Sequence, residues 1–449
     1  MDLEGPDSPT PTDGDADADA TSEPAPPRGV TRRKVLRYGL AGAAGLAGTG
    51  AVASLFFGPD RASWSSAPSA EVFKGDAPTG ETWAQWRQRG WAREASHYRR
   101  LRDRVRCRLC PNNCLLDPGD RGRCRNRVNV DGTLYTMVYG NPCSLNNDPI
   151  EKKPLYHFLP RTGVVSIATS GCGFRCLNCQ NWEISQRKPE ETKDPTGPEV
   201  LGTPERLRAG LTRGDLKRLS LFPEHVVALA ESVQSPSIAY TYSEPTCFYE
   251  YMLDTARLAR QRGLKNVWVT CGYIHREPLE EFCEVLDAAN VDLKSFDEQT
   301  YEKLNSGKLQ PILDTLKTLK NRGVWFEVTH LVVPTYTDKM DMIRRMCGWL
   351  VENLGPDVPL HFSKFHPRHK LAQLPETPAA TLIEARDIAR KAGLRYVYVG
   401  NVLVADGGTT FCPKCGRPVL VRRGYQILLN DVQAGRCRHC RTPIAGVWA

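Results

Sequence analysis

The sequence predicts an α/β protein in which an open barrel of strand–helix units is flanked by a small cysteine-rich segment on each side. Three observations lead to this fold class. Apolar runs of strand length alternate with amphipathic segments of helix length through residues 161–405, a pattern typical of βαβ units around a parallel sheet. A three-cysteine loop at 170–181 follows the first of these strands. Two further groups of four cysteines lie outside the repeating part.

The repeating part is expected to form a partial (βα)6 barrel, because the strand–helix unit recurs about six times after its first strand. Residues 187–218 are polar and broken by Pro and Gly, so we expect a surface insertion there, with a short helix at 204–211. The expected strands are residues 164–169, 237–242, 266–270, 290–294, 324–333, 360–365 and 395–400. The expected helices are residues 223–234, 248–263, 278–288, 311–322, 338–354 and 378–392.

The N-terminal residues 1–30 are expected to be a disordered acidic tail, since they contain little that could be buried. Residues 1–28 hold eight acidic residues and one basic residue, so they carry −7 of a formal net charge of +9 and the remainder carries +16. A basic body suits an acidic partner or an anionic substrate, and it is equally the solvated surface of a basic enzyme.

A signal or anchor is expected at residues 31–57. Arg32 and Arg33 precede the uncharged stretch 38–57, which resembles a twin-arginine (Tat) signal with a small-residue cleavage site at 51–53. The alternative is a single membrane-spanning anchor. We therefore expect membrane association or Tat export, with a cytoplasmic protein as the other alternative.

The N-terminal extension, residues 58–160, is expected to contain one or two amphipathic helices between 81 and 104 and then a metal site. Four thiols fall within eighteen residues, at Cys107, Cys110, Cys114 and Cys124. Structural zinc is the favoured interpretation, and an auxiliary iron–sulfur cluster that relays electrons is the alternative.

The C-terminal segment, residues 406–449, is predicted to be a zinc-ribbon-like module. Its two Cys-x2-Cys pairs are Cys412 with Cys415 and Cys437 with Cys440, a spacing typical of structural zinc. A rubredoxin-like iron site is the minor alternative. The five remaining cysteines are expected to be small buried hydrophobes: Cys143, Cys247, Cys271, Cys283 and Cys347.

The loop after the first strand places Cys172, Cys176 and Cys179 in one tight turn. A ferredoxin [4Fe–4S] cluster normally takes four cysteines, so three leave one iron open, as a catalytic metal site requires. In barrels of this kind the chemistry lies at the C-terminal ends of the strands. The alternative is a zinc knuckle with His157 or another cysteine as the fourth ligand.

This loop resembles the cluster loop of radical SAM enzymes, and Cys176-x2-Cys179-Gln-Asn also resembles pyruvate formate-lyase activating enzymes. Residues 105–445 are similar to the AmmeMemoRadiSam-system radical SAM enzymes. The resemblance implies a [4Fe–4S] cluster that cleaves S-adenosylmethionine (SAM) to methionine and a 5′-deoxyadenosyl radical. It also implies an external low-potential electron donor, and Amme-type and Memo-type proteins as partners. The matching stretches are residues 148–158, 238–246, 290–294, 361–367 and 396–401.

The same resemblance implies a set of residues that contact SAM. Glu244, with Ser243 beside it, corresponds to a glycine-glycine-glutamate position, although Tyr242 and Ser243 replace the glycines. Lys294 is expected to be both catalytic and cofactor-binding, paired with Asp292 on the same strand face; a structural ion pair is the alternative. The other implied contacts are Asn178, Thr270 and His366.

Two departures from the family pattern qualify these expectations. Val269 stands where activating enzymes carry an aspartate, which puts a monovalent-cation site in doubt. Asn178 replaces an aromatic residue, so it can hydrogen-bond the adenine but cannot stack on it.

The sequence thus predicts a radical SAM enzyme that abstracts hydrogen from an unidentified substrate. A glycyl-radical enzyme activase is the alternative within this class. A zinc-binding scaffold for nucleic acid or protein is the alternative of another class. The scaffold leaves the strand-end carboxylates and the three-cysteine loop unexplained, so the enzyme is favoured and nucleic acid is not expected as a partner.

Overall fold

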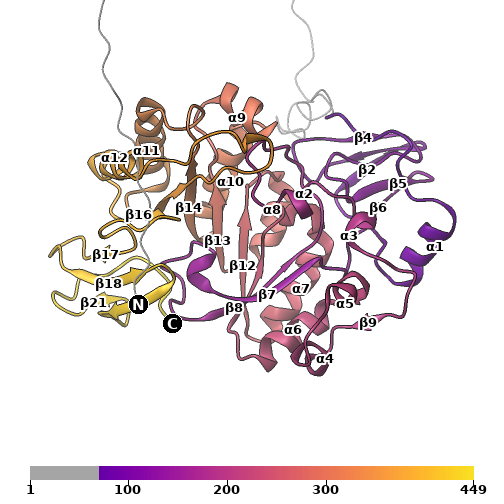
Figure 1. The fold of residues 1–449 in the computed structure, drawn as a ribbon, viewed down its shortest axis with the longest axis horizontal. Helices are drawn as coiled ribbons and strands as arrows, with labels where there is room; N and C mark the ends of the chain where they lie inside the picture. Colours follow the sequence, from indigo (N-terminus) through magenta and orange to yellow (C-terminus); the bar gives the residue numbers. More distant parts are fainter. Residues whose placement is uncertain (1–69) are drawn as a thin grey trace, which may run out of the picture. The chain divides into compact units, whose positions relative to one another are not determined.

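A central sheet of eight strands organises the computed structural model, which describes residues 70–449. These residues belong to one compact unit, 65–449. The strand order is β16-β15-β14-β13-β12-β11-β8-β7, and all neighbours are parallel except β7 and β8 (Figure 1). All seven strands expected in the repeating part are therefore confirmed. The sheet comprises β7 (Ser144–Pro149), β8 (Gly163–Ala168), β11 (Ser237–Tyr240), β12 (Lys265–Thr270), β13 (Ala288–Asp292), β14 (Trp325–Val332), β15 (Leu360–Lys364) and β16 (Val397–Gly400).

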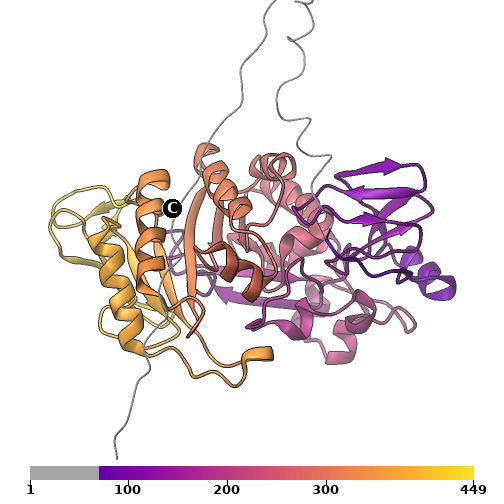
Figure 2. The ribbon, with the colours of Figure 1, turned by 90° about the horizontal axis from the view of Figure 1, so that it is seen from above.

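Helices between the strands cover the outer side of the curved sheet, as the view from above shows (Figure 2). In α10, for example, Ile312, Leu316 and Leu319 are buried while Lys317 and Lys320 are exposed, the pattern of a helix that packs on a sheet. The six expected helices are confirmed within a few residues at their ends. They are α6 (Pro223–Ser232), α7 (Tyr249–Gln261), α8 (Arg276–Cys283), α10 (Gln310–Asn321), α11 (Met340–Leu354) and α12 (Ala379–Lys391).

One helix of the barrel was not expected, α9 (Glu298–Asn305). The carboxylate of Asp297 accepts a hydrogen bond from the Thr300 amide at 2.8 Å and caps the first turn. An aspartate in this position is a favoured N-cap, so the signal was present in the sequence.

The expectation of helix throughout residues 81–104 is wrong in its second half. Only α1 (Gly80–Gln88) is helical, and the chain then forms β1 (Arg93–Glu94), β2 (Tyr98–Leu101) and β3 (Arg104–Cys107). The β2–β3 hairpin alternates arginines on its outer face with buried residues such as Val105 and Cys107, and this period of two favours strand over helix. The rest of the N-terminal segment is β4 (Leu115–Leu116), β5 (Arg127–Val130) and β6 (Thr133–Thr136).

The insertion at residues 187–218 contains the expected short helix, α4 (Pro204–Arg208), together with α3 (Pro189–Thr192) and α5 (Arg213–Arg218). A short parallel pair joins the middle of the insertion, β9 (Val200–Leu201), to the residues that follow it, β10 (Leu219–Ser220). Lys193 anchors the insertion, because its buried ammonium group donates to the carbonyls of Pro142, Leu216 and Leu219. The insertion is therefore fixed to the core rather than only laid on the surface.

The C-terminal module forms a three-stranded sheet of β17 (Thr410–Phe411), β18 (Pro418–Arg423) and β19 (Gln426–Asn430), and a pair of β20 (Val432–Gln433) and β21 (Arg436–Cys437). Among the helices of residues 70–449, none is long and apolar enough to cross a membrane. The acidic tail and the signal or anchor expected at residues 1–57 lie outside the described residues.

Candidate active site and its cysteine groups

The three-cysteine loop follows the C-terminal end of β8, where the sequence placed it. Cys176 is buried, and Cys172 and Cys179 are half-buried. Each sulfur has a polar neighbour, and hydrogen bonds to sulfur favour the thiolate that binds metal. The contacts are the Phe174 amide to Cys172 Sγ at 3.3 Å, Asn305 Nδ2 to Cys176 Sγ at 3.2 Å, and Ser185 Oγ with Cys179 Sγ at 3.1 Å.

The three sulfurs open into a cavity of about 540 Å³ at the C-terminal ends of the parallel strands, a size suited to a cofactor with a substrate. Burial raises the pKa of Cys176 to about 11 and raises the pKa of Cys172 further. A metal bound here would therefore displace protons from these thiols. Of the sequence-predicted residues, the cavity is lined by Cys172, Cys176, Asn178, Cys179, Ser243, Glu244, Thr270, Asp292 and Lys294.

Glu244 is a buried, fully oriented carboxylate. Its side chain is not in an exposed turn, since the residue is 4% exposed. Oε1 accepts hydrogen bonds from the Thr246 amide at 3.0 Å and from Thr270 Oγ1 at 2.7 Å, and Oε2 accepts from the Cys271 amide at 2.9 Å. These donors hold the negative charge in place beside the three-cysteine loop.

Asp292 and Lys294 form an ion pair of 2.8 Å at the end of β13. Burial lowers the pKa of Lys294, but the Asp292 carboxylate and the nearby Cys176 thiol outweigh it, so the pKa lies well above its usual value. Lys294 therefore keeps its positive charge next to Cys176. Asp292 and Lys294 are therefore paired with each other, and both line the cavity of the three-cysteine loop, as the sequence suggested.

The cavity wall also holds polar atoms that are free to bind a ligand. In the described part of the chain, neither Asn178 Oδ1 nor Ser243 Oγ has a hydrogen-bond partner, although both atoms are buried. Buried polar atoms are normally paired, so these two residues fit a polar cofactor. Three thiols, an ion pair and two unpaired polar atoms together fit an iron–sulfur cluster with SAM beside it.

His366 does not belong to this group. Its Nδ1 pairs with the Glu376 carboxylate at 2.7 Å on a half-exposed loop, and it does not line the cavity. His361, the second residue of β15, lines the cavity instead. His361 and His366 lie only five residues apart, so the sequence does not show which of the two side chains points into the cavity.

The sequence did not predict a second group of polar residues in the cavity wall, which centres on Asp148 near the end of β7. The Asp148 carboxylate pairs with Lys152 at 2.9 Å, with the buried Lys153 at 2.5 Å, and with the Tyr242 hydroxyl. Tyr242 has a φ of +63° where the family pattern has glycine, and these contacts hold that backbone in place. Both lysines line the cavity, so they add positive charge to its wall.

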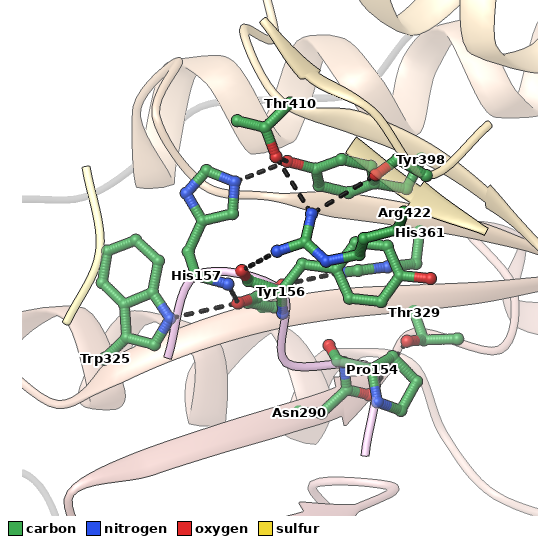
Figure 3. A network of polar contacts seen from close by, with 12 residues as sticks. Pro154, Tyr156, His157, Asn290, Trp325, Thr329, His361, Tyr398, Thr410 and Arg422 are labelled. Carbon is green, nitrogen blue, oxygen red and sulfur yellow. Dashed lines mark hydrogen bonds and ion pairs between the residues drawn. The ribbon is translucent and has the colours of Figure 1, made fainter. Parts of the chain in front are cut away.

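Glu327 is a fully buried residue of β14. Its contacts join members of the polar network drawn in Figure 3, among them Tyr156, His157 and His361. Its carboxylate accepts hydrogen bonds from the amides of Tyr156 and His157, at 3.0 and 2.7 Å, and from His361 Nε2 at 2.6 Å. His157 is further bonded to the Ala445 carbonyl and the Tyr398 hydroxyl. With both ring nitrogens engaged here, His157 is not a ligand of the three-cysteine loop, and the zinc-knuckle alternative loses its nearest fourth ligand.

The C-terminal module is docked on this network by Arg422. Its guanidinium donates to the Tyr156 carbonyl at 2.5 Å and to Thr410 Oγ1 at 3.1 Å, and it lies 4.3 Å from the centre of the Tyr156 ring (Figure 3). Arg422 is 6% exposed, so it is not part of a nucleic-acid-binding surface. The C-terminal module is thus packed against the barrel through buried contacts.

The C-terminal thiols converge as a zinc site requires. Cys412 Sγ lies 3.5 Å from Cys440 Sγ, and Cys415 Sγ lies 3.8 Å from Cys437 Sγ. Zn–S bonds of about 2.3 Å in a tetrahedron place thiolates about 3.8 Å apart. The four N-terminal thiols, Cys107, Cys110, Cys114 and Cys124, also converge, but around a cavity of their own.

This chain is similar to several known proteins. The family model described as the radical SAM superfamily matches residues 166–347. An uncharacterized protein of Methanocaldococcus jannaschii is 44% identical over 351 residues, which are 78% of this chain and 97% of that protein. A pyruvate formate-lyase-activating enzyme of Clostridium pasteurianum is 26% identical over 196 residues, or 44% of this chain and 72% of the enzyme. A solved domain of a pyruvate-formate lyase-activating enzyme from Bacteroides vulgatus matches 36% of this chain and 98% of the domain, at 16% identity and a TM-score of 0.32.

Proposed function

Because this chain belongs to the radical SAM superfamily of enzymes, we propose that it uses a [4Fe–4S] cluster and SAM to abstract hydrogen from a substrate bound in the barrel cavity. One observation carries the proposal: the three thiols of the loop line the same cavity as Glu244 and the Asp292–Lys294 pair. A zinc-binding scaffold does not account for the buried Glu244 carboxylate and the Asp292–Lys294 ion pair in the same cavity as three thiols.

Each group has a defined part in this proposal. Cys172, Cys176 and Cys179 would hold three irons of the cluster and leave the fourth open. When bound, the cluster and SAM supply a 5′-deoxyadenosyl radical, which is chemistry of the cofactor rather than of the side chains.

The protein's own contribution is binding and orientation. The Glu244 carboxylate is held rigid by Thr246, Thr270 and the Cys271 amide, so it is preorganised for a positively charged or hydrogen-donating part of SAM. Lys294 offsets the negative charge of the thiolates. Asn178 and Ser243 offer unpaired polar atoms to the adenosine. The C-terminal module and the Glu327 network meet at Tyr156, a residue of the cavity wall, so they hold that part of the wall in place.

The test is anaerobic reconstitution of the full chain with iron and sulfide. We expect a broad visible absorption that dithionite bleaches, and release of 5′-deoxyadenosine when SAM is added. Cys176→Ala should abolish the release, whereas Cys347→Ala, at a buried cysteine of α11 far along the chain, should not. Wild-type protein that binds iron but releases no 5′-deoxyadenosine would overturn the proposal.

Glycyl-radical activation is a second candidate within this class. It is favoured by the similarity to a pyruvate formate-lyase-activating enzyme over 72% of that enzyme. Mixing the reduced protein and SAM with pyruvate formate-lyase should then give a glycyl-radical EPR signal. Release of 5′-deoxyadenosine without that signal would leave the first proposal standing with another substrate.

A further inference from the structure

The N-terminal cysteines surround a cavity that the proposed reaction does not use. Cys107 ends β3, Cys114 precedes β4, and the Cys107 amide donates to the Cys114 carbonyl at 2.9 Å, which brings the two thiols to one side of the hairpin. Cys110 and Cys124 come from the two adjoining turns. All four thiols line one small cavity of about 20 Å³.

The spacing of these thiols differs from that of the C-terminal group. Among residues 70–449, the C-terminal thiols are the one group of metal-ligating atoms that all lie within 4.8 Å of one another. That closeness is what a single zinc ion requires, since thiolates around zinc are about 3.8 Å apart. The N-terminal thiols do not meet this limit, although all four line one cavity. A four-iron cluster separates its thiolates in this way, because each one binds a different iron.

The walls of the cavity suit a cluster as well. Apolar and aromatic side chains, Leu109, Phe174 and Tyr273, enclose it, and burial of this kind protects an iron–sulfur cluster and tunes its potential. Two cysteines that we expected to be isolated hydrophobes, Cys247 and Cys271, also line it. Cys247 contacts Cys124 directly, so it is a neighbouring thiol rather than an isolated one.

Positive charge and hydrogen bonds to sulfur accumulate at this site. The Arg127 guanidinium lies 3.7 Å from Cys107 Sγ, and the Arg123 amide lies 3.5 Å from Cys114 Sγ. Arg125 and Arg175 lie within electrostatic range of both Cys124 and Cys172. These donors and guanidinium groups would stabilise thiolates bound to zinc or to an iron–sulfur cluster alike. The choice between the two therefore rests on the spacing of the thiols and on the cavity that they line.

The cavity shares a wall with the three-cysteine loop. Asn112 Nδ2 and Arg123 Nε both donate to the Gly173 carbonyl, at 3.2 and 3.1 Å. Asn126 Nδ2 donates to the Ser170 carbonyl at 2.7 Å. Gly171, at φ +90°, lies against the Cys124 carbonyl, where a Cβ atom would come within 2.5 Å. The loops that carry the two cysteine groups are therefore packed against each other.

We propose that Cys107, Cys110, Cys114 and Cys124 hold a second [4Fe–4S] cluster rather than zinc, and that this cluster passes electrons to the three-cysteine site. With four protein ligands it has no open iron, so it cannot bind SAM. It accepts one electron from a low-potential one-electron carrier, a reduced flavin or iron–sulfur protein, and is reoxidised when that electron moves on. No atom or proton is transferred. The relay role rests on the proposed function, but the cluster itself does not.

The test is the iron, sulfide and zinc content of the full chain after anaerobic reconstitution, with EPR spectra of the reduced protein. We expect about eight irons and eight sulfides per chain in the wild type, besides about one zinc in the C-terminal module. The variant Cys172→Ala/Cys176→Ala/Cys179→Ala should keep about four irons. Its reduced cluster should give an EPR signal that added SAM does not change.

Further variants keep the outcomes distinct. Cys107→Ser/Cys110→Ser should retain about four irons whose EPR signal responds to SAM, and Cys347→Ser should match the wild type. If Cys107→Ser/Cys110→Ser does not fold, the three-alanine variant decides alone. If metal analysis of the three-alanine variant finds no iron and about two zinc ions per chain, the inference is overturned. If it keeps about four irons while the wild type fails to cleave SAM, the proposed function fails and the second cluster stands.

Discussion

Thr270 Oγ1 donates a hydrogen bond of 2.7 Å to Glu244 Oε1, which joins the C-terminal ends of two neighbouring strands, β11 and β12. Both side chains are buried and both line the cavity. The carboxylate position is thus set by a residue that lies 26 positions away in the sequence.

Thr270→Val should weaken SAM binding because the Glu244 carboxylate loses one of its buried donors. Hydrogen bonds to charged groups contribute about 1.5–3 kcal/mol, so we expect SAM affinity to fall by roughly tenfold or more. Calorimetric titration of the reconstituted protein with SAM measures this. The matched control is Thr318→Val, which removes a solvent-facing hydroxyl bonded to the Asp314 carbonyl in α10. Equal affinity in both variants would remove Glu244 from the SAM site.

Lys294→Met should lower both cluster retention and SAM cleavage. The substitution removes the positive charge near Cys176. It also leaves the Asp292 carboxylate, which is 37% exposed, without its ion-pair partner, so negative charge accumulates around the thiolates. Lys294→Arg should retain part of the activity, because the positive charge stays. Iron content and 5′-deoxyadenosine release are the measurements, with the exposed Lys303→Met as control. If Lys294→Met behaves like Lys303→Met, the ion pair is only structural.

The stability of the barrel should fall in acid because of His157. Burial lowers the pKa of His157 to about 4, from 6.5. The unfolded chain therefore binds the proton more readily, and stability is full above pH 6.5 and is lost as the pH falls toward 4. The difference corresponds to roughly 3 kcal/mol.

Thermal unfolding between pH 7 and 4 tests this assignment. The Tm of the wild type should fall more steeply with decreasing pH than the Tm of His157→Gln. Tyr398→Phe removes the hydrogen bond to the imidazole but keeps the titrating group, so its slope should match the wild type. A slope that His157→Gln leaves unchanged would assign the acid sensitivity to other groups.

Arg422→Ala should destabilise the whole described unit rather than the C-terminal module alone. It removes the contacts to the Tyr156 carbonyl and Thr410 and leaves buried acceptors unpaired, at a cost of about 1–3 kcal/mol. Removal of zinc from Cys412, Cys415, Cys437 and Cys440 by a chelator should lower the Tm in the same direction. The neighbouring Arg423 is exposed, so Arg423→Ala should have little effect; a similar loss in both variants would contradict the docking role.

Gly171→Ala should prevent the two cysteine groups from packing together. Its Cβ would lie 2.3 Å from Asn126 Oδ1 and 2.5 Å from the Cys124 carbonyl, at a φ of +90°. Gly210→Ala is the matched control, because Gly210 has a φ of +88° but nothing within 4 Å. It reproduces the backbone strain without the clash. Iron retention after gel filtration should drop in Gly171→Ala and not in Gly210→Ala.

Much of the fold followed from local patterns. The alternation of apolar strands with helices of period 3.6 predicts the order of the parallel strands, because consecutive βαβ units place each strand beside the previous one. The expectation of helix at residues 93–104 is wrong, although this short run is rich in arginine and offers few apolar residues from which to read a period. The sheet context selected strand, and that context is not local.

The sequence by itself determined which groups of thiols can bind a metal, because ligand chemistry is set by residue type and by short spacings. Cys172, Cys176 and Cys179, and the two C-terminal pairs, are close in the chain and therefore close in space. Tertiary structure alone decided the rest. It placed His361 in the cavity wall and His366 outside it. It also brought together residues that are far apart in the sequence: Thr270 with Glu244, Arg422 with Tyr156, and Cys124 with Gly171. Each of these depends on the directions of side chains from separate elements, and packing sets those directions only once the sheet has formed.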